Sequence, residues 1–295
     1  MKKKIQKLKE RIQQADAVII GAGAGLSTAA GFVYAGERFE RYFEDFGRKY
    51  SFHDMYSGGF YPYSTQEEFW AYFSRNIWVN RYMDAPKRTY EALFRLVQGK
   101  DYFVLTTNVD HCFQKAGFDK KRLFYTQGDY GLFQCTKPCC KKTWDNEDIV
   151  RRMVLSQGFA IGQGGRLTVP EGVVPALRVP TELLPKCPNC GRPLTMNLRA
   201  DDKFVEDAGW QDAAVEYEAW LTAHQDRRVL YLEIGVGWNT PGIIKFNFWN
   251  QANQNRNATY ACLNAEDTRV PGELMDRGIG IMGDSAQIIA ALAGG

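Results

Sequence analysis

Residues 16–31 form the first group whose types and spacing could do chemistry. A short apolar run passes into alternating glycine and alanine at Gly23, Ala24 and Gly25, and then into Ser27, where a helix can begin. Glycines let the backbone approach a pyrophosphate, and the N–H groups at a helix start face the anion with the helix dipole behind them. The stretch therefore predicts a nucleotide-phosphate site, and a glycine loop without a ligand is the alternative.

Cysteines supply the second group, because they cluster in two places. Cys187 and Cys190 have C-x-x-C spacing, and Cys135 precedes the adjacent Cys139 and Cys140. Two such pairs predict a structural four-thiolate zinc ribbon, and we prefer Cys139 as the fourth ligand because a proline precedes it. A redox-active dithiol is the alternative.

Polar residues and glycines follow apolar runs that have the character of buried parallel strands. These runs occupy 101–108, 123–125, 228–234, 258–263 and 278–282. In open sheets, ligands bind at the carboxyl ends of the strands, near the point where the winding reverses. The candidate binding residues found there are Asn108, Asp110, Gln127, Gly235, Val236, Gly237, Asn264 and Asp284.

Helical patterns must position these groups. A helix is expected over 3–14, a second one after Thr65, which with Glu68 forms a capping box, and a third from Pro86 to a stop at Gly99. Because helices separate most of the strands, the pattern predicts an α/β fold.

The expected architecture is a Rossmann-like, doubly wound parallel sheet with a smaller domain made of a zinc ribbon and a helical module. The chain would form one domain of 295 residues with insertions. The nucleotide-binding part is expected over 1–35, 84–133 and 200–295, with an aromatic helical insertion over 36–83 and the zinc ribbon over 134–199.

Composition narrows the class of protein. Hydrophobic residues make up 45% of the chain and charged residues 24%, and no apolar run reaches the length that spans a bilayer. The basic N-terminus leads into an amphipathic pattern and lacks the apolar core of a signal peptide, so we expect a cytoplasmic protein that does not bind membranes. The net charge of +3 is too small to indicate nucleic-acid binding.

The same motifs resemble those of the sirtuins, in order and in approximate spacing, along the whole chain. They are residues 23–31, Thr107-Asn108-Val109-Asp110, the two cysteine pairs, Gly235-Val236-Gly237, Asn264 and Gly283-Asp284. The resemblance implies a Rossmann-type NAD-binding domain, a small domain with zinc and helices, and cleavage of the bond between nicotinamide and ribose.

The resemblance also implies roles for single residues in binding NAD. Ala24, Gly25 and Ser27, next to Gly23, would lie on the pyrophosphate side. Asn108 and Asp110 would line the nicotinamide-ribose pocket, whereas Gly235, Asn264 and Asp284, with Val236 and Gly237, would lie at the adenosine end.

Three departures from the sirtuin pattern bear on the reaction. Residues 32–36 replace the usual Ile-Pro-Asp-Phe-Arg, Thr107 replaces a glutamine, and Gln127 replaces the catalytic histidine. An amide cannot accept a proton near neutral pH, so the acyl migration of a deacylase should stall. Loss of nicotinamide needs mainly positioning and electrostatic stabilisation, which Asn108 and Gln127 could provide as catalytic residues.

These departures resemble the class M, macrodomain-linked sirtuins, which act as protein ADP-ribosyltransferases. That resemblance implies transfer to a lipoyl-carrier protein similar to the glycine-cleavage H protein, in a response to oxidative stress, with a macrodomain hydrolase as functional partner. Residues 32–83 and 141–186 are the expected acceptor surfaces.

Other functions stay open from sequence. One is an ordinary lysine deacylase that uses His111 or water as the base, and another is an NAD-binding protein without activity. A nicotinamide oxidoreductase fits less well, because the glycine turn lacks the acidic residue that a dinucleotide fingerprint places about 20 residues later.

Overall fold

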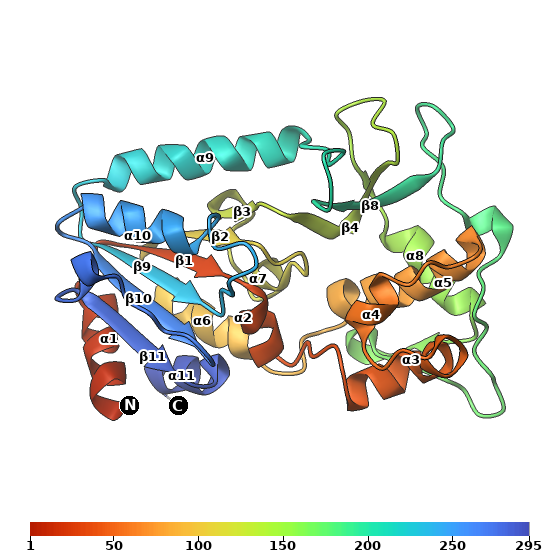
Figure 1. The fold of residues 1–295 in the computed structure, drawn as a ribbon, viewed down its shortest axis with the longest axis horizontal. Coiled ribbons are helices and arrows are strands. Elements are labelled where there is room, and N and C mark those ends of the chain that lie inside the picture. The colour runs from red at the N-terminus through yellow and green to blue at the C-terminus, as the bar shows by residue number, and fades with distance from the viewer. Residues whose placement is uncertain (295) are drawn as a thin grey trace. The chain divides into compact units, whose positions relative to one another are not determined.

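The central sheet has six parallel strands in the order β11-β10-β9-β1-β2-β3 (Figure 1). Apolar side chains fill these strands because both faces of the sheet are covered. Their bounds are β1 (Ala17–Ala22), β2 (Asp101–Thr106), β3 (Leu123–Tyr125), β9 (Val229–Ile234), β10 (Thr259–Asn264) and β11 (Gly278–Met282). The predicted doubly wound parallel sheet is confirmed.

The computed structural model describes residues 1–294, which fall into two units. Unit 1 comprises Met1–Gly31, Ala85–Gly128 and Ala208–Gly295, and contains the six-stranded sheet. Unit 2 comprises Phe32–Asp84 and Asp129–Asp207.

The winding of the sheet reverses at β1. The chain runs from β1 outward through β2 to β3, and then returns to place β9 on the other side of β1. Ala22, the last residue of β1, pairs with Thr106 of β2 and with Ile234 of β9. Several candidate binding residues therefore follow strands that end side by side at the reversal point.

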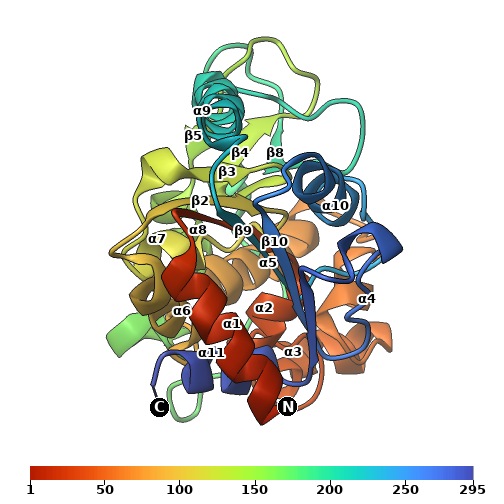
Figure 2. The same cartoon turned by 90° about the vertical axis from the view of Figure 1, so that its left-hand side faces the viewer.

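Helices cover the sheet on both faces (Figure 2). On one face lie α9 (Ala208–His224) and α10 (Lys245–Gln254). The other face is covered by α1 (Lys2–Gln14), α2 (Ala24–Ala29), α6 (Thr89–Val97) and α11 (Ser285–Leu292). Two short helices, η2 (Lys120–Arg122) and η5 (Gly272–Leu274), and α7 (Cys112–Lys115) complete unit 1.

The prediction that Pro86 opens a helix is wrong, because α6 begins at Thr89. The preceding segment is held by a different contact, in which Lys87 donates its N–H to the carbonyl of Ala30 at 3.0 Å. Pro86 packs closely on Gly31, where a Cβ would lie 2.7 Å from the proline ring. This segment is therefore tied to the end of α2.

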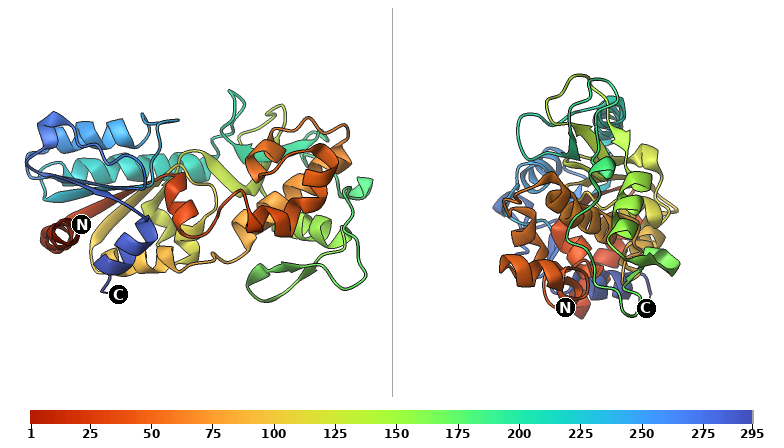
Figure 3. Two further views of the ribbon diagram at one scale, coloured as in Figure 1. Left: turned by 60° about the horizontal axis from the view of Figure 1, so that its bottom comes forward. Right: turned by 90° about the vertical axis from the view of Figure 1, so that its right-hand side faces the viewer.

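Unit 2 combines helices with a three-stranded sheet of order β5-β4-β8 (Figure 3). The helices are α3 (Glu37–Tyr50), α4 (Met55–Gly59), α5 (Gln66–Ile77), the π-helix η1 (Trp78–Tyr82), α8 (Glu147–Ser156), η3 (Gln163–Gly165) and η4 (Thr181–Leu183). The strands are β4 (Gly128–Cys135), β5 (Trp144–Asp145), β8 (Leu194–Leu198) and the small β6 (Ala160–Ile161) and β7 (Leu167–Thr168) pair.

The aromatic residues of the expected helical insertion form much of the core of unit 2. Phe43, Phe46, Trp70 and Tyr72 are almost fully buried and pack against one another or their neighbours. Helix α5 begins where predicted, since the Thr65 hydroxyl accepts the N–H of Glu68 at 3.3 Å.

Among residues 1–294, no helix has both the length and the apolar character needed to cross a bilayer.

Candidate active site

The glycine turn between β1 and α2 packs directly on the loop that follows β9. Gly25 donates its N–H to the carbonyl of Gly235 at 2.9 Å, and Gly23 donates to Ile234 at 3.0 Å. A Cβ on Gly23 would lie 2.6 Å from the Gly235 oxygen, and one on Gly25 would lie 2.7 Å from the Gly235 Cα. These glycines are therefore needed for backbone-to-backbone packing at the reversal point, whatever they do for a ligand.

This packing changes which donors of the turn can face an anion. The N–H of Gly25 is already used by Gly235, and that of Leu26 is donated to Gly23 at 3.0 Å. Within residues 1–294, no acceptor is found for the N–H of Ala24, which is an exposed residue. Of the residues expected on the pyrophosphate side, Ala24 rather than Gly25 presents the open backbone donor.

Polar side chains from three segments meet next to this turn. Ser27 donates its hydroxyl to Asp110 Oδ2 at 2.5 Å and lies 3.1 Å from the hydroxyl of Tyr90. Asn108 donates its amide to the carbonyl of Gly23 at 3.0 Å. The structure thus brings together Ser27, Asn108 and Asp110, three residues singled out in the sequence.

Asp110 and Thr106 place these side chains by local hydrogen bonds. Asp110 Oδ1 accepts the N–H of Cys112, the first residue of α7, at 3.0 Å. Thr106, at the end of β2, donates its hydroxyl to Ala22 at 2.9 Å and accepts the N–H of Asn108 at 3.0 Å. The Asn108 backbone is therefore fixed relative to the end of β1.

Gln127 follows β3, the next strand in the sheet. The preceding Thr126 donates its N–H and its hydroxyl to the carbonyl of Thr106, at 3.0 and 3.1 Å. The Gln127 side chain is half-buried, and its amide has no hydrogen-bond partner among residues 1–294. The backbone next to Gln127 is thus held in place while its side-chain amide is available to bind substrate.

His111, the alternative base, is committed elsewhere. Its ring stacks on Tyr125, with the ring centroids 4.0 Å apart, and its Nδ1 lies 2.5 Å from Gln114 Oε1. The side chain is buried, and residue 111 has a left-handed backbone conformation with φ of 58°. These contacts turn the imidazole toward α7 and β3, so they do not favour a deacylase that uses it.

The residues expected at the adenosine end hold neighbouring loops together. Asn264 donates its amide to the carbonyl of Val236 at 3.0 Å, and its own carbonyl accepts the N–H of Gly283 at 2.9 Å. Asp284 caps α11 by accepting the N–H of Ala286 at 2.7 Å. Gly237 is exposed in the loop after β9. Asn264 and Asp284 are thus engaged in hydrogen bonds within the fold.

Sequence reasoning missed a buried ion pair beneath the loop that follows β9. Lys245 Nζ contacts Glu233, and both side chains are fully buried. Tyr260 donates its hydroxyl to the other Glu233 oxygen at 2.7 Å. In sequence, Glu233 interrupts an apolar strand and is the only signal that could have pointed to this pair.

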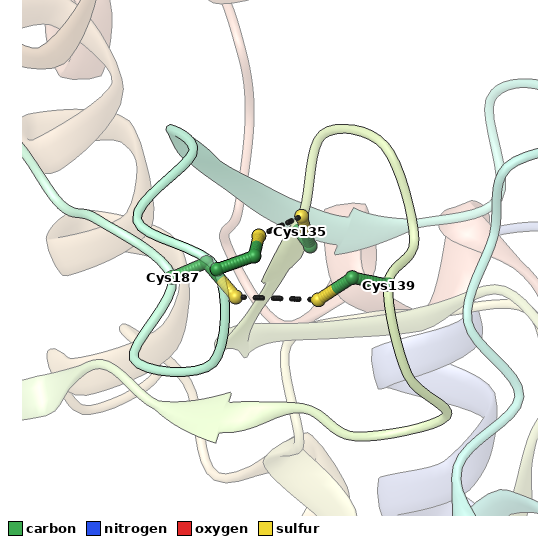
Figure 4. A group of neighbouring side chains, drawn as sticks. Cys135, Cys139 and Cys187 are labelled. Atoms are coloured by element: carbon green, nitrogen blue, oxygen red, sulfur yellow. Dashed lines mark hydrogen bonds between the residues drawn. The ribbon is translucent and has the colours of Figure 1, made fainter.

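Four cysteines of unit 2 form a cluster that could hold a metal ion (Figure 4). The sulfurs of Cys135, Cys139, Cys187 and Cys190 all lie within 4.8 Å of one another. Cys135 and Cys190, and likewise Cys139 and Cys187, have sulfurs 3.6 Å apart. Zinc–sulfur bonds of about 2.3 Å in a tetrahedron require sulfurs about 3.8 Å apart, so the arrangement fits a closed thiolate site.

The surroundings of Cys139 favour its thiolate form. Asn189 donates its amide to the Cys139 sulfur at 3.2 Å, and this hydrogen bond lowers the pKa of Cys139 to about 6. Gly191, with φ of 72°, allows the tight turn in which its N–H reaches the Cys187 carbonyl. Cys140 has its sulfur 4.0 Å from that of Cys139 but lies outside the group of four.

Comparison with known proteins places this arrangement in a family. No family model matches the chain. The chain is 39% identical over 289 residues to a protein ADP-ribosyltransferase of Staphylococcus aureus (strain Mu50 / ATCC 700699), and the match covers 97% of this chain and 86% of the relative.

A second relative is a probable bifunctional ADP-ribose hydrolase/ADP-ribosyltransferase of Fusarium oxysporum f. sp. cubense. It is 31% identical over 245 residues, which cover 81% of this chain and 38% of the fungal protein. More than half of that longer protein therefore lies outside the match.

Solved structures show the same fold. A Sir2 enzyme structure has a TM-score of 0.56 at 15% identity, covering 99% of this chain and 97% of that one. A complex of a Sir2 homologue with NAD has a TM-score of 0.53 at 14% identity, covering 98% and 92%. The chain belongs to the sirtuin-type protein ADP-ribosyltransferases, NAD-dependent enzymes built on the Sir2 fold.

Proposed function

We propose that the protein acceptor of this ADP-ribosyltransferase is a lipoyl-carrier protein similar to the glycine-cleavage H protein, modified once it carries lipoate, in a response to oxidative stress. The support is the resemblance of residues 32–36, Thr107 and Gln127 to the class M sirtuins, together with the two transferase relatives.

The observation that carries the proposal is the amide of Gln127. In the transfer, the bond between nicotinamide and ribose C1′ breaks, and its electron pair leaves with nicotinamide. A nucleophile on the acceptor protein then forms a bond to C1′ and loses its proton. Asn108 and Gln127 can orient the ribose and stabilise the positive charge that develops at C1′. An amide provides no base for acyl migration, so the proposed outcome is transfer of ADP-ribose.

A macrodomain hydrolase that removes the modification is the proposed functional partner. The fungal relative supports this pairing, because its name joins an ADP-ribose hydrolase and an ADP-ribosyltransferase in one protein. A hydrolase acting on the same product would make the modification reversible.

The proposed acceptor can be tested with one carrier protein in two forms. NAD and the enzyme are incubated with the lipoylated carrier or with the same carrier lacking lipoate, and intact masses are measured. We expect one added ADP-ribose on the lipoylated form alone. Equal modification of both forms, or none, would rule out the lipoyl carrier while leaving transfer to another protein untouched.

The acceptor surface is proposed to include an exposed aromatic pair, Tyr56 of α4 and Phe60, which directly follows that helix. Tyr56 and Phe60 are 64% and 73% exposed, and their rings lie 4.8 Å apart. Exposed aromatics in contact are typical anchors of protein interfaces. Replacing both by serine is expected to slow transfer to the carrier about tenfold, as lost anchors do, while nicotinamide release without carrier stays unchanged.

Val215→Ser is the matched control for this surface, because Val215 is 66% exposed on α9 of unit 1. It should leave both rates unchanged. Parallel loss of NAD binding and transfer in the double variant would count against an acceptor surface at α4.

We further propose that the cysteine cluster holds a structural zinc ion. Metal analysis should find about one zinc per chain in the wild type, and Cys187→Ser should lose it, because a closed site needs all four thiolates. Cys140→Ser is the control and should keep its zinc. Retention of zinc by Cys187→Ser would exclude this cluster as the metal site.

A further inference from the structure

Tyr90, on α6, is a buried tyrosine whose hydroxyl lies among the residues of the candidate active site. Its side chain is 1% exposed, and its hydroxyl is 3.1 Å from Ser27 Oγ and 3.5 Å from Asn108 Nδ2. The sequence shows Tyr90 only as one apolar residue of a helix face. Its hydroxyl therefore links two residues that come from different strand ends.

The direction of each hydrogen bond in this group follows from chemistry. The Asp110 carboxylate can only accept, so Ser27 must donate to it and keeps its oxygen to accept from Tyr90. The Tyr90 oxygen then accepts from the Asn108 amide. The result is one chain of donors that runs from Asn108 through Tyr90 and Ser27 to Asp110.

Desolvation keeps the Tyr90 hydroxyl, the middle group of this hydrogen-bond series, protonated. Burial raises the pKa of Tyr90 well above its usual value, and the neighbouring Asp110 carboxylate raises it further. The Tyr90 hydroxyl is therefore protonated throughout the working pH range and can always donate to Ser27.

The same hydrogen bonds determine which atom of the Asn108 amide is left without a partner in the protein. One amide hydrogen goes to the carbonyl of Gly23, which can only accept, and the other goes to Tyr90. Both hydrogens are then committed to the protein. Within the described residues no donor reaches Asn108 Oδ1, and this oxygen is not a fully buried atom. Asn108 thus presents a fixed acceptor oxygen.

We propose that Tyr90 is a positioning residue for NAD cleavage, which acts by locking the Asn108 amide so that Oδ1 faces the ribose. A fixed amide oxygen can accept a hydrogen bond from a ribose hydroxyl. It also directs the negative end of the amide dipole toward the positive charge that develops at C1′. This proposal depends on NAD cleavage by the enzyme and not on which protein accepts ADP-ribose.

A variant can separate the proposed positioning role of the Tyr90 hydroxyl from the packing role of its ring. The ring packs edge-to-face on Phe113, with centroids 4.9 Å apart, and Tyr90→Phe keeps this packing while removing the hydroxyl. Tyr217→Phe is a matched control, because Tyr217 is also buried in unit 1 and also binds an asparagine amide, that of Asn247, at 2.8 Å.

The test measures nicotinamide release from NAD without an acceptor protein. We expect Tyr90→Phe to lower kcat about tenfold, the effect of one lost orienting hydrogen bond, with KM for NAD within about twofold. Tyr217→Phe should lose similar thermal stability but keep its kcat. In an Asn108→Ala background, Tyr90→Phe should cause no further loss, because the group through which it acts is gone.

Two results would overturn the proposal: a kcat for Tyr90→Phe within about twofold of wild type, or a loss of the same size with and without Asn108. If Tyr90→Phe does not fold, Ser27→Ala removes another member of the same hydrogen-bond series, at a half-buried position. A wild-type kcat for Ser27→Ala would also overturn the proposal. A failure to modify the lipoyl carrier would leave all these rates unchanged, so the two proposals fail separately.

Discussion

Replacing Asn108 by alanine is expected to slow nicotinamide release about a hundredfold, the usual loss when one preorganised polar group is removed from a reaction centre. Asn108 is buried, and its amide is held by Gly23 and Tyr90. The loss should fall on kcat, because the oxygen matters most once positive charge develops on the ribose. Single-turnover release of labelled nicotinamide measures this rate, and calorimetric titration measures NAD binding.

Asn247→Ala serves as the control for this variant. Asn247 also donates a side-chain amide to a buried tyrosine of unit 1, so its loss should cost comparable stability and leave kcat unchanged. A rate for Asn108→Ala within about threefold of wild type would contradict a catalytic role for that side chain.

Gly235→Ala is expected to destabilise the protein and to weaken NAD binding strongly. Gly235 has φ of 61°, where an L-residue is strained, and an added Cβ would lie 2.6 Å from the Gly25 Cα. Left-handed strain and overpacking together should cost about 2–5 kcal/mol of unfolding free energy. Because the atoms in the way are backbone, the glycine turn itself must move.

Denaturant unfolding gives the stability of this variant, and titration with NAD gives its affinity. Gly242→Ala is the matched control, since an added Cβ there has no neighbour within 4 Å and its φ lies outside the left-handed region. If Gly235→Ala kept wild-type stability and affinity, the close packing between the glycine turn and the loop after β9 would be wrong.

Much of the fold could be predicted because it follows from local patterns. Buried parallel strands appear as short apolar runs, and Thr65 with Glu68 marks the start of α5. The start of α6 could not be predicted in this way. Pro86 suits the first turn of a helix, but Lys87 binds Ala30, and that contact depends on the folded position of α2.

The candidate site was predictable in its residue types and not in its hydrogen bonds. Gly25 was expected to approach a pyrophosphate, whereas its N–H is donated to Gly235, far away in sequence. Tyr90 gave no signal, because a tyrosine on an apolar helix face has the pattern of a core residue. Only the fold brings its hydroxyl to Ser27 and Asn108.

The distinction between transfer and deacylation depends on Gln127 and His111. The sequence alone left His111 open as a base, since it lies three residues after Asn108. Its left-handed backbone and its contacts with Gln114 and Tyr125 are tertiary features. They turn the imidazole of His111 into the protein. The candidate group for the reaction is then the amide of Gln127, which follows β3.

The most direct test is mass spectrometry of the products when the enzyme is given NAD, a lipoylated carrier protein and an acyl-lysine peptide together. We predict that the carrier gains the mass of one ADP-ribose, that Asn108→Ala or Gln127→Ala strongly slows this gain, and that the peptide keeps its acyl group. Formation of O-acyl-ADP-ribose, with the carrier unchanged, would contradict the account.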